Sequence, residues 1–252
     1  MSGGRPFAGW VSAPLTIAAL ALLALAGACR GASSSAPATP VGPRQVEAPL
    51  EPVRALYPAV SPALLPYWAG GEVGAFDRNG VRVYLGQTAD APAAYGQLLK
   101  GDVEVYLTPL TPELAAQAAD GADLAILGGT PDLAIVTTRR LLSTREVVLE
   151  RFLRGVLEGI HAVQTRPDLA RDLLVRQAGL ASAADADQAL QTYLDHGGTE
   201  RVPYMATADV EALIAQALPA SRAESVDADA LLEQTILRRL EASGFVAGLY
   251  RA

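Results

Sequence analysis

The stretch that decides the fold is Val81 to Leu127, VRVYLGQTADAPAAYGQLLKGDVEVYLTPLTPELAAQAADGADLAIL. Two of its segments, Val81–Leu85 and Val103–Leu107, alternate apolar side chains with polar ones or tyrosine, which is the period of a β-strand. A continuously apolar run at Leu124–Leu127 is typical of a strand covered on both faces. The Ala- and Leu-rich segments between these strands predict helices. The order strand, helix, strand, helix, strand indicates a mostly parallel sheet with right-handed crossovers.

Composition allows one or two domains and argues against several functional classes. The 252 residues are 50% hydrophobic, which is enough apolar material for a real core. Lys and Arg number 20 against 27 Asp and Glu, and Lys100 is the only lysine. Nucleic-acid binding needs a basic face, so no nucleic-acid partner is expected. One cysteine and two histidines cannot form a disulfide framework or a zinc site alone, so no metal and no cofactor is expected.

The first 29 residues have the pattern of an export signal. Arg5 precedes an apolar run from Val11 to Ala26, and small residues follow. The segment Leu25–Cys29 resembles a lipobox, in which Cys29 becomes the lipidated N-terminus, although its leucine stands one position further out than usual. Ala26-Gly27-Ala28 is also an ordinary cleavage site, and an uncleaved anchor is a third alternative. We favour lipidation of Cys29, because a lone cysteine just after the apolar run is hard to explain otherwise.

A tether and a globular part are expected after the signal. Residues 30–52 are rich in Ser, Ala, Pro and Gly without periodicity, which predicts a disordered tether. The globular part is expected to span 53–252, with further strands at Val53–Val60 and Leu133–Thr137. A first helix is expected to open at Ser61 and Pro62. A C-terminal run of helices is expected to begin in turn at Ser143, Pro167, Ser182, Thr207 and Asp227.

Four stretches, in order along the chain, carry a resemblance to one family. Ser61–Asp77 is similar to that family's opening helix, which ends Gly-Tyr-Phe, with Ala75 in place of the Tyr. Leu98–Val105 resembles its Leu-x-x-Gly-x-Val-Asp-Val step. Thr137–Ala162 is similar to its hinge return and first closing helix, and Gly244–Tyr250 to its C-terminal signature. The family is the extracytoplasmic solute-binding proteins of ABC importers, in the branch for nitrate, sulfonates, taurine and thiamine-pyrimidine precursors.

The resemblance implies a type 2 periplasmic-binding-protein fold, with one large departure. Such proteins have two α/β lobes, and the chain crosses to the second lobe after a strand like Leu124–Leu127. It returns just before a segment like Thr137–Arg140. Here the two crossing points are joined by Gly128–Asp132 alone, so a lobe of roughly 100 residues is missing. We interpret the chain as a single-lobe member or a decayed paralogue; a misassembled gene is a further alternative.

Candidate ligand-binding residues follow from the expected sheet. Ligands of open α/β sheets bind beyond the carboxyl ends of the strands, where this sequence offers Ser61, Gln87, Thr88 and Thr108. Backbone N–H groups and helix dipoles at such points favour anions, although Ser and Thr are also expected there as helix caps. His196, just before a Gly-Gly pair, is expected to be a surface or capping residue.

No catalytic residue is expected. The sequence shows no Ser-His-Asp spacing, no Gly-rich phosphate loop and no paired-carboxylate motif. Enzymes that resemble this family make the thiamine pyrimidine and carry a Cys-rich motif with an essential His, neither of which is present here. The chain is therefore not expected to be an enzyme.

The sequence predicts a membrane-tethered, extracytoplasmic protein that captures a small, anionic organic solute for the permease subunits of an ABC importer. Without lipidation of Cys29 it would be periplasmic or secreted. Half a cleft buries less ligand than a complete pocket does. Weak affinity is therefore expected unless two copies face each other as a homodimer. The alternative is a degenerate single-lobe relative that acts as a non-transporting scaffold and presents the former cleft face to a protein partner.

Overall fold

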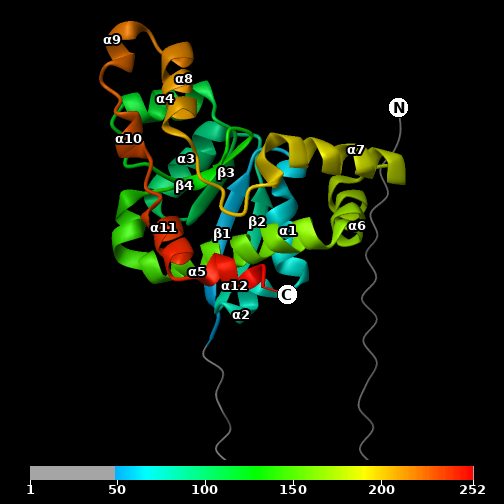
Figure 1. The fold of residues 1–252 in the computed structure, drawn as a ribbon. Coiled ribbons are helices and arrows are strands. Elements are labelled where there is room, and N and C mark those ends of the chain that lie inside the picture. The colour runs from blue at the N-terminus through cyan, green and yellow to red at the C-terminus, as the bar shows by residue number, and fades with distance from the viewer. Residues whose placement is uncertain (1–48, 252) are drawn as a thin grey trace, which may run out of the picture. The chain divides into compact units, whose positions relative to one another are not determined.

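A computed structural model describes residues 49–251, which form a five-stranded sheet with helices on both faces (Figure 1). The predicted signal, Cys29 and most of the predicted tether lie outside the described residues. The strand order is β2-β1-β3-β5-β4, and β1 pairs in parallel with both β2 and β3. The fifth strand is antiparallel to both β3 and β4, so β1 to β4 all run in one direction. The strands are β1 Glu51–Tyr57, β2 Val81–Gln87, β3 Val105–Thr108, β4 Ala125–Thr130 and β5 Leu133–Thr137.

All five predicted strands are confirmed, with modest shifts at their ends. The first strand begins at Glu51, two residues before the expected start at Val53. The mostly parallel α/β architecture and the single lobe are confirmed as well. The described helical elements are η1 Pro62–Leu64, α1 Leu65–Glu72, α2 Ala75–Arg78, α3 Ala91–Lys100, α4 Pro112–Ala119, α5 Arg139–Thr165, α6 Pro167–Ala178, α7 Ala183–Tyr193, η2 Leu194–Gly198, α8 Thr207–Ala217, α9 Ala220–Ala223, α10 Ala228–Leu231, α11 Thr235–Ala242 and α12 Phe245–Leu249.

Two helix predictions were wrong in their boundaries. The long helix α5 is capped by Thr138, whose hydroxyl accepts from the Leu141 amide, whereas Ser143 lies inside the helix and donates to the Arg140 carbonyl. The helix predicted to start at Asp227 is divided into α10 and α11. Between them the chain turns to the edge of the sheet, where the Glu233 amide donates to the Ile126 carbonyl at 2.9 Å.

The predicted joint at the missing lobe is a tight β-hairpin. Strand β4 continues through Gly128 and Gly129 to Thr130, so that only Pro131 and Asp132 connect it to β5. A side chain at position 129 is sterically excluded, since a Cβ there would lie 2.3 Å from the Leu133 carbonyl oxygen at a φ of +120°. The Gly129 amide donates instead to the carbonyl of Pro203 at 2.7 Å, which ties the hairpin to the C-terminal helical segment.

Helices bury both faces of the sheet and so create two hydrophobic clusters. One cluster packs α1, α5, α6, α7 and α11 against the side chains of Val53, Val105 and Ile135. The other packs α3, α4, α8 and α10 against Tyr106 and Val136. In Figure 1 the elements α4, α8, α9 and α10 lie on one side of the sheet, and α1, α6 and α7 lie on the other.

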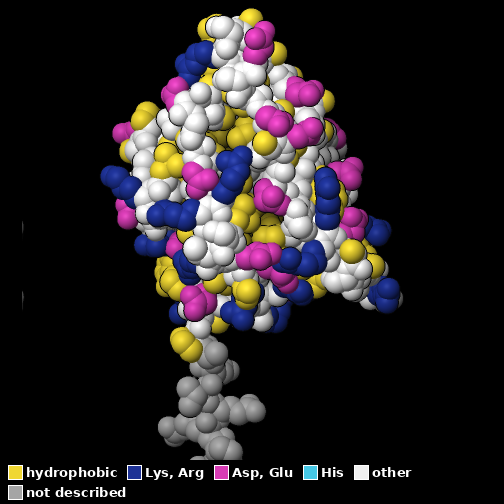
Figure 2. Space-filling model, turned by 90° about the vertical axis from the view of Figure 1, so that its left-hand side faces the viewer, with side chains coloured by type: hydrophobic (Ala, Val, Ile, Leu, Met, Phe, Trp, Pro, Cys, Tyr) yellow, Lys and Arg dark blue, Asp and Glu magenta, His cyan; other side chains and the backbone are white. Residues whose placement is uncertain are grey.

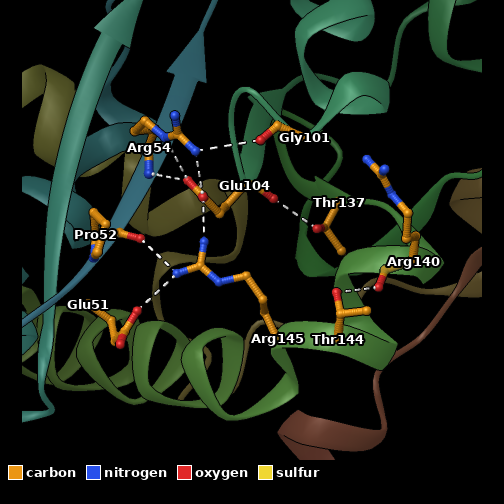
Figure 3. A network of polar contacts seen from close by, with 9 residues as sticks. All are labelled: Glu51, Pro52, Arg54, Gly101, Glu104, Thr137, Arg140, Thr144 and Arg145. Carbon is orange, nitrogen blue, oxygen red and sulfur yellow. Dashed lines mark hydrogen bonds and ion pairs between the residues drawn. The ribbon is translucent and has the colours of Figure 1, made fainter.

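A buried carboxylate ties together the amino ends of β1 and β3 (Figure 3). The side chain of Glu104, 2% exposed, accepts hydrogen bonds from the Arg54 amide at 2.7 Å and from the Arg54 guanidinium at 2.9 Å. Arg145 of α5 donates to the same carboxylate at 2.5 Å and to Glu51 at 3.3 Å. The backbone of Arg145 leaves the helical region, with φ −133° and ψ 30°, at this contact. We call Glu104, Arg54 and Arg145 the Glu104 network.

The surface seen in Figure 2 carries interspersed acidic and basic side chains, with hydrophobic side chains in the hollows between them. Basic side chains do not gather into one patch on this face. Among residues 49–251, no helix is both long and apolar enough to span a bilayer.

Candidate binding cavity at the carboxyl ends of the strands

A cavity of about 280 Å³ lies where the carboxyl ends of the strands meet the C-terminal helices. Its floor is formed by the residues that follow β1, by Pro109 after β3, and by the β4–β5 hairpin. The opposite wall comes from α1 and α5, through Tyr67, Val156 and Ile160, and from the end of α7. This is the edge of an open α/β sheet at which ligands bind.

Most of the cavity wall is apolar and rigid. Five of the lining residues are prolines, and none of the lining residues is Lys or Arg. Proline has no amide hydrogen and a fixed φ, so it removes a hydrogen-bond donor and stiffens the wall. The five prolines are Pro58, Pro62, Pro66, Pro109 and Pro203.

The charged groups of the lining gather at one end of the cavity, which we call the mouth. It is formed by Thr130, Asp132, His196 and Glu200, which also line an adjoining pocket. The Nδ1 atom of His196 lies 3.1 Å from an Asp132 carboxylate oxygen. Asp132, His196 and Glu200 are all exposed. The mouth therefore carries two carboxylates and a single imidazole.

Two tyrosines place their rings in the apolar wall. Tyr67 is 4% exposed and Tyr193 is 8% exposed, and both line the cavity. Burial raises the pKa of each hydroxyl well above its ordinary value of 10, and each is neutral at physiological pH. Within residues 49–251 the structure records no hydrogen bond from either hydroxyl, so both are available to a bound molecule.

Of the four residues predicted to bind ligand, the structure brings only Ser61 to this cavity. Thr108 is buried beneath the floor, and its hydroxyl donates to the Pro109 carbonyl at 3.2 Å. Gln87 and Thr88 end the edge strand β2. There the Thr88 amide donates to the Tyr57 carbonyl at 2.9 Å, and the Thr88 hydroxyl accepts from the Asp90 amide at 3.3 Å. Thr88 therefore has a local structural role, while contact of Gln87, Thr88 or Thr108 with ligand stays a prediction.

The mouth residues were missed because they come from distant parts of the sequence. Asp132 lies in the hairpin turn, whereas His196 and Glu200 follow α7. His196 was expected to be a surface or capping residue; it is 61% exposed inside η2, where no side-chain cap is formed and its Nδ1 contacts Asp132 instead. No local pattern pairs it with Asp132. The only sequence signals were the Gly197-Gly198 pair after His196 and the Gly128-Gly129 pair before the turn.

A glutamine holds the mouth segment in place. The side-chain amide of Gln164 in α5 donates to the Gly198 carbonyl at 2.8 Å and to the Glu200 carbonyl at 3.0 Å. The amide oxygen of Gln164 accepts from the Tyr250 hydroxyl near the C-terminus. The ring of Tyr250 in turn lies beneath the guanidinium of Arg201, 4.3 Å from the ring centroid. The C-terminal segment therefore supports the backbone of the mouth.

Solved structures show what this architecture resembles. A protein from Bordetella bronchiseptica RB50 superposes with a TM-score of 0.62 at 10% identity, covering 76% of this chain and 97% of that one. A Candida albicans protein described as having the generic periplasmic binding protein fold gives 0.52 at 11% identity, covering 77% and 95%. The alkanesulfonate-binding protein SsuA from Xanthomonas axonopodis pv. citri, bound to MOPS, gives 0.54 at 11% identity, covering 74% and 99%.

These likenesses define the class of fold. The chain has a periplasmic-binding-protein-like fold, with a cavity at the edge of the sheet where such a fold binds ligands. No protein-family model and no curated protein matches the sequence.

Proposed function

We propose that the chain is an extracytoplasmic solute-binding protein of an ABC importer, held at the membrane by a lipid on Cys29. The observation that carries the proposal is the cavity at the carboxyl ends of β1, β3 and β4, in a chain with the periplasmic-binding-protein fold. Its 280 Å³ lie just below the usual range of small-molecule sites, about 300–1,000 Å³. The partners in this proposal are a small organic solute and the permease subunits.

The ligand class predicted from the sequence was an anion such as a sulfonate, nitrate or a pyrimidine precursor. Two of the neighbouring structures are named for sulfonate binding, which supports a small organic solute. The cavity itself supports the organic part of that prediction more than the charge, because its walls are apolar and its mouth carries two carboxylates.

A thermal-shift screen of the full chain in mild detergent tests solute binding. The panel contains nitrate, taurine, alkylsulfonates, aromatic carboxylates, pyrimidines and small amines. A ligand that binds only the folded state raises the melting temperature, and the rise grows with the logarithm of one plus the ratio of its concentration to its Kd. Ala59 is exposed and lines the cavity, so Ala59→Trp is expected to abolish the shift without unfolding the chain.

The matched control is Ala184→Trp, which places the same side chain on an exposed position of α7 that does not line the cavity. Its melting shift is expected to equal that of the unmodified chain. A cooperative melt that no compound shifts would contradict the proposal and favour the non-transporting scaffold.

Two further measurements test the assembly. Because one lobe covers only part of a ligand, we expect ligand to promote a homodimer, with the two cavities facing each other, in analytical ultracentrifugation. A strictly monomeric protein with and without ligand would contradict the dimer. Cys29→Ser is expected to move the protein from the membrane fraction to the soluble fraction, and an unchanged distribution would contradict lipidation.

A further inference from the structure

The cavity lining lacks the cationic side chains of a typical anion site, and its side-chain donors are neutral hydroxyls and the imidazole of His196. Anions bind to backbone N–H groups, to helix N-termini and to Lys or Arg side chains. The five prolines of the wall lack amide hydrogens, and no Lys or Arg lines the cavity. The helical turn that follows β1 begins at Pro62, which has no amide hydrogen, and continues directly into α1 at Leu65. The connection after β3 likewise begins with Pro109.

Acceptors, by contrast, are plentiful at the mouth. Asp132 and Glu200 contribute carboxylates, and Thr130 contributes a hydroxyl, which can both accept and donate. The Asp132 carboxylate is also paired with His196, at 3.1 Å. The nearest guanidinium in sequence belongs to Arg201, which lies over the ring of Tyr250 and is not among the lining residues. The fixed charge at the mouth therefore favours a cation.

The chamber behind the mouth suits an apolar body. It is walled by Leu133, Val156 and Ile160 together with the rings of Tyr67 and Tyr193. Aliphatic and aromatic walls both favour burial of hydrocarbon. The hydroxyls of the two tyrosines, which make no hydrogen bond within residues 49–251, add polar contacts without adding charge.

From this arrangement we infer that the cavity selects a small organic cation, whose apolar body occupies the chamber and whose ammonium group meets Asp132 and Glu200 at the mouth. The inference rests on the proposed solute-binding function and names its ligand class. It sets this chain apart from the sulfonate-binding proteins that share its fold.

Three probes that share a benzyl group but differ in charge test the preference: benzylamine, benzyl alcohol and phenylmethanesulfonate. Their affinities for the full chain are measured by isothermal titration calorimetry. Benzylamine is expected to bind roughly tenfold more tightly than phenylmethanesulfonate, with benzyl alcohol between them. Ala59→Trp is expected to abolish binding of benzylamine.

Variants that each neutralise one carboxylate test where the ammonium group of the ligand binds. Asp132→Asn and Glu200→Gln are each expected to weaken benzylamine roughly 3- to 10-fold and to leave benzyl alcohol unchanged, since both carboxylates are exposed. Glu211→Gln, on an exposed position of α8 that does not line the cavity, makes the same change in net charge and is expected to have no effect.

The outcomes separate this inference from the proposed function. Tighter binding of phenylmethanesulfonate, abolished by Ala59→Trp, would overturn the cation preference and still support a solute-binding protein. Benzylamine binding that survives Ala59→Trp would overturn the inference, because the site would lie elsewhere. No binding by these probes or by any compound of the screening panel would overturn both.

Discussion

The two ends of the sheet differ in whether their polar groups are hydrogen-bonded within the protein. At the amino end, the Glu104 carboxylate is 2% exposed and accepts hydrogen bonds from the Arg54 amide and from the guanidinium groups of Arg54 and Arg145. At the carboxyl end, prolines remove donors, two tyrosine hydroxyls are unpaired within the described residues, and a cavity remains. One end is closed by hydrogen-bonded polar groups and the other keeps a cavity lined by prolines and apolar side chains, so the Glu104 network and the proposed binding site lie at different edges of the sheet.

The largest effect is expected where helices α1 and α5 form the cavity wall. A Cβ on Gly159 would lie 1.9 Å from the Pro66 carbonyl oxygen and 3.0 Å from the Gly70 amide nitrogen. Gly159→Ala must therefore push the two helices apart, and we expect it to cost about 3 kcal/mol or more of unfolding free energy. Urea denaturation followed by circular dichroism measures the loss.

The control for this packing is Gly96→Ala in α3, where an added Cβ meets nothing within 4 Å. That change is expected to stabilise the protein by about 0.5–1 kcal/mol through helix propensity. Equal effects of the two substitutions would show that the close approach of α1 and α5 does not limit stability.

The second-largest effect is expected at the amino end of the sheet, in the Glu104 network. Glu104→Ala removes the acceptor of the Arg54 amide and of two guanidinium groups, and we expect a loss of about 2–3 kcal/mol in the same denaturation measurement. The exposed partner provides the control, since Glu51→Ala is expected to cost at most about 1 kcal/mol.

Benzylamine affinity of the folded Glu104→Ala protein is expected to be unchanged, because the network does not line the cavity. A large loss of affinity would contradict the separation of the two ends.

The same carboxylate gives stability a defined dependence on pH. Burial alone would raise the pKa of Glu104, but hydrogen bonds and charge from Arg54 and Arg145 outweigh it and hold the pKa below its ordinary 4.5. The pKa of Glu150 is lowered in the same way by Arg154 and Arg239, against the opposing effect of burial. A carboxylate with a lowered folded pKa stabilises the protein above pH 4.5, and this stabilisation is lost as pH falls through the folded value.

We therefore expect the unfolding free energy to fall as pH drops below about 5, with a shallower fall in Glu104→Gln. Denaturant titrations at a series of pH values provide the measurement. An identical pH slope in the variant would show that the Glu104 pKa is not shifted by folding.

Sequence reasoning recovered the sheet because its signals are local. The alternation in Val81–Leu85 and the apolar run at Leu124–Leu127 each depend on neighbouring residues, and both became strands. The single helix predicted to begin at Asp227 is divided because a tertiary contact, the bridge of Leu232 to Ile126, overrides its local helical pattern. Periodicity does not report such a contact.

The residues of the cavity were harder to predict because tertiary contacts bring them together from distant parts of the sequence. Ser61 was predicted because ligands bind beyond the ends of strands, which is a rule of topology, and it does line the cavity. Asp132, His196 and Glu200 meet only after the hairpin and the end of α7 have folded together. The prolines that remove donors are visible in the sequence, but their convergence on one cavity is a tertiary property. The sequence therefore predicted a site at the edge of the sheet where the cavity lies, while its predicted preference for an anion stays a prediction.

The smallest effects are expected at the support of the mouth. Gln164→Leu removes the two hydrogen bonds to the Gly198 and Glu200 carbonyls, and we expect it to cost about 1–2 kcal/mol in the denaturation measurement. It is also expected to weaken benzylamine binding severalfold, because Glu200 loses its fixed backbone position. Calorimetry on the folded variant measures this second effect.

Tyr250→Phe separates the two roles of this glutamine. It removes only the hydroxyl that donates to the Gln164 amide oxygen and leaves both bonds from the Gln164 side chain to the mouth carbonyls in place. We expect a cost of about 1 kcal/mol with little change in benzylamine affinity. If Tyr250→Phe weakened binding as much as Gln164→Leu, the mouth would depend on the C-terminal anchor rather than on the two direct bonds. If neither variant changed binding, the position of Glu200 would be set by the hairpin side of the cavity, where Gly129 bonds to Pro203.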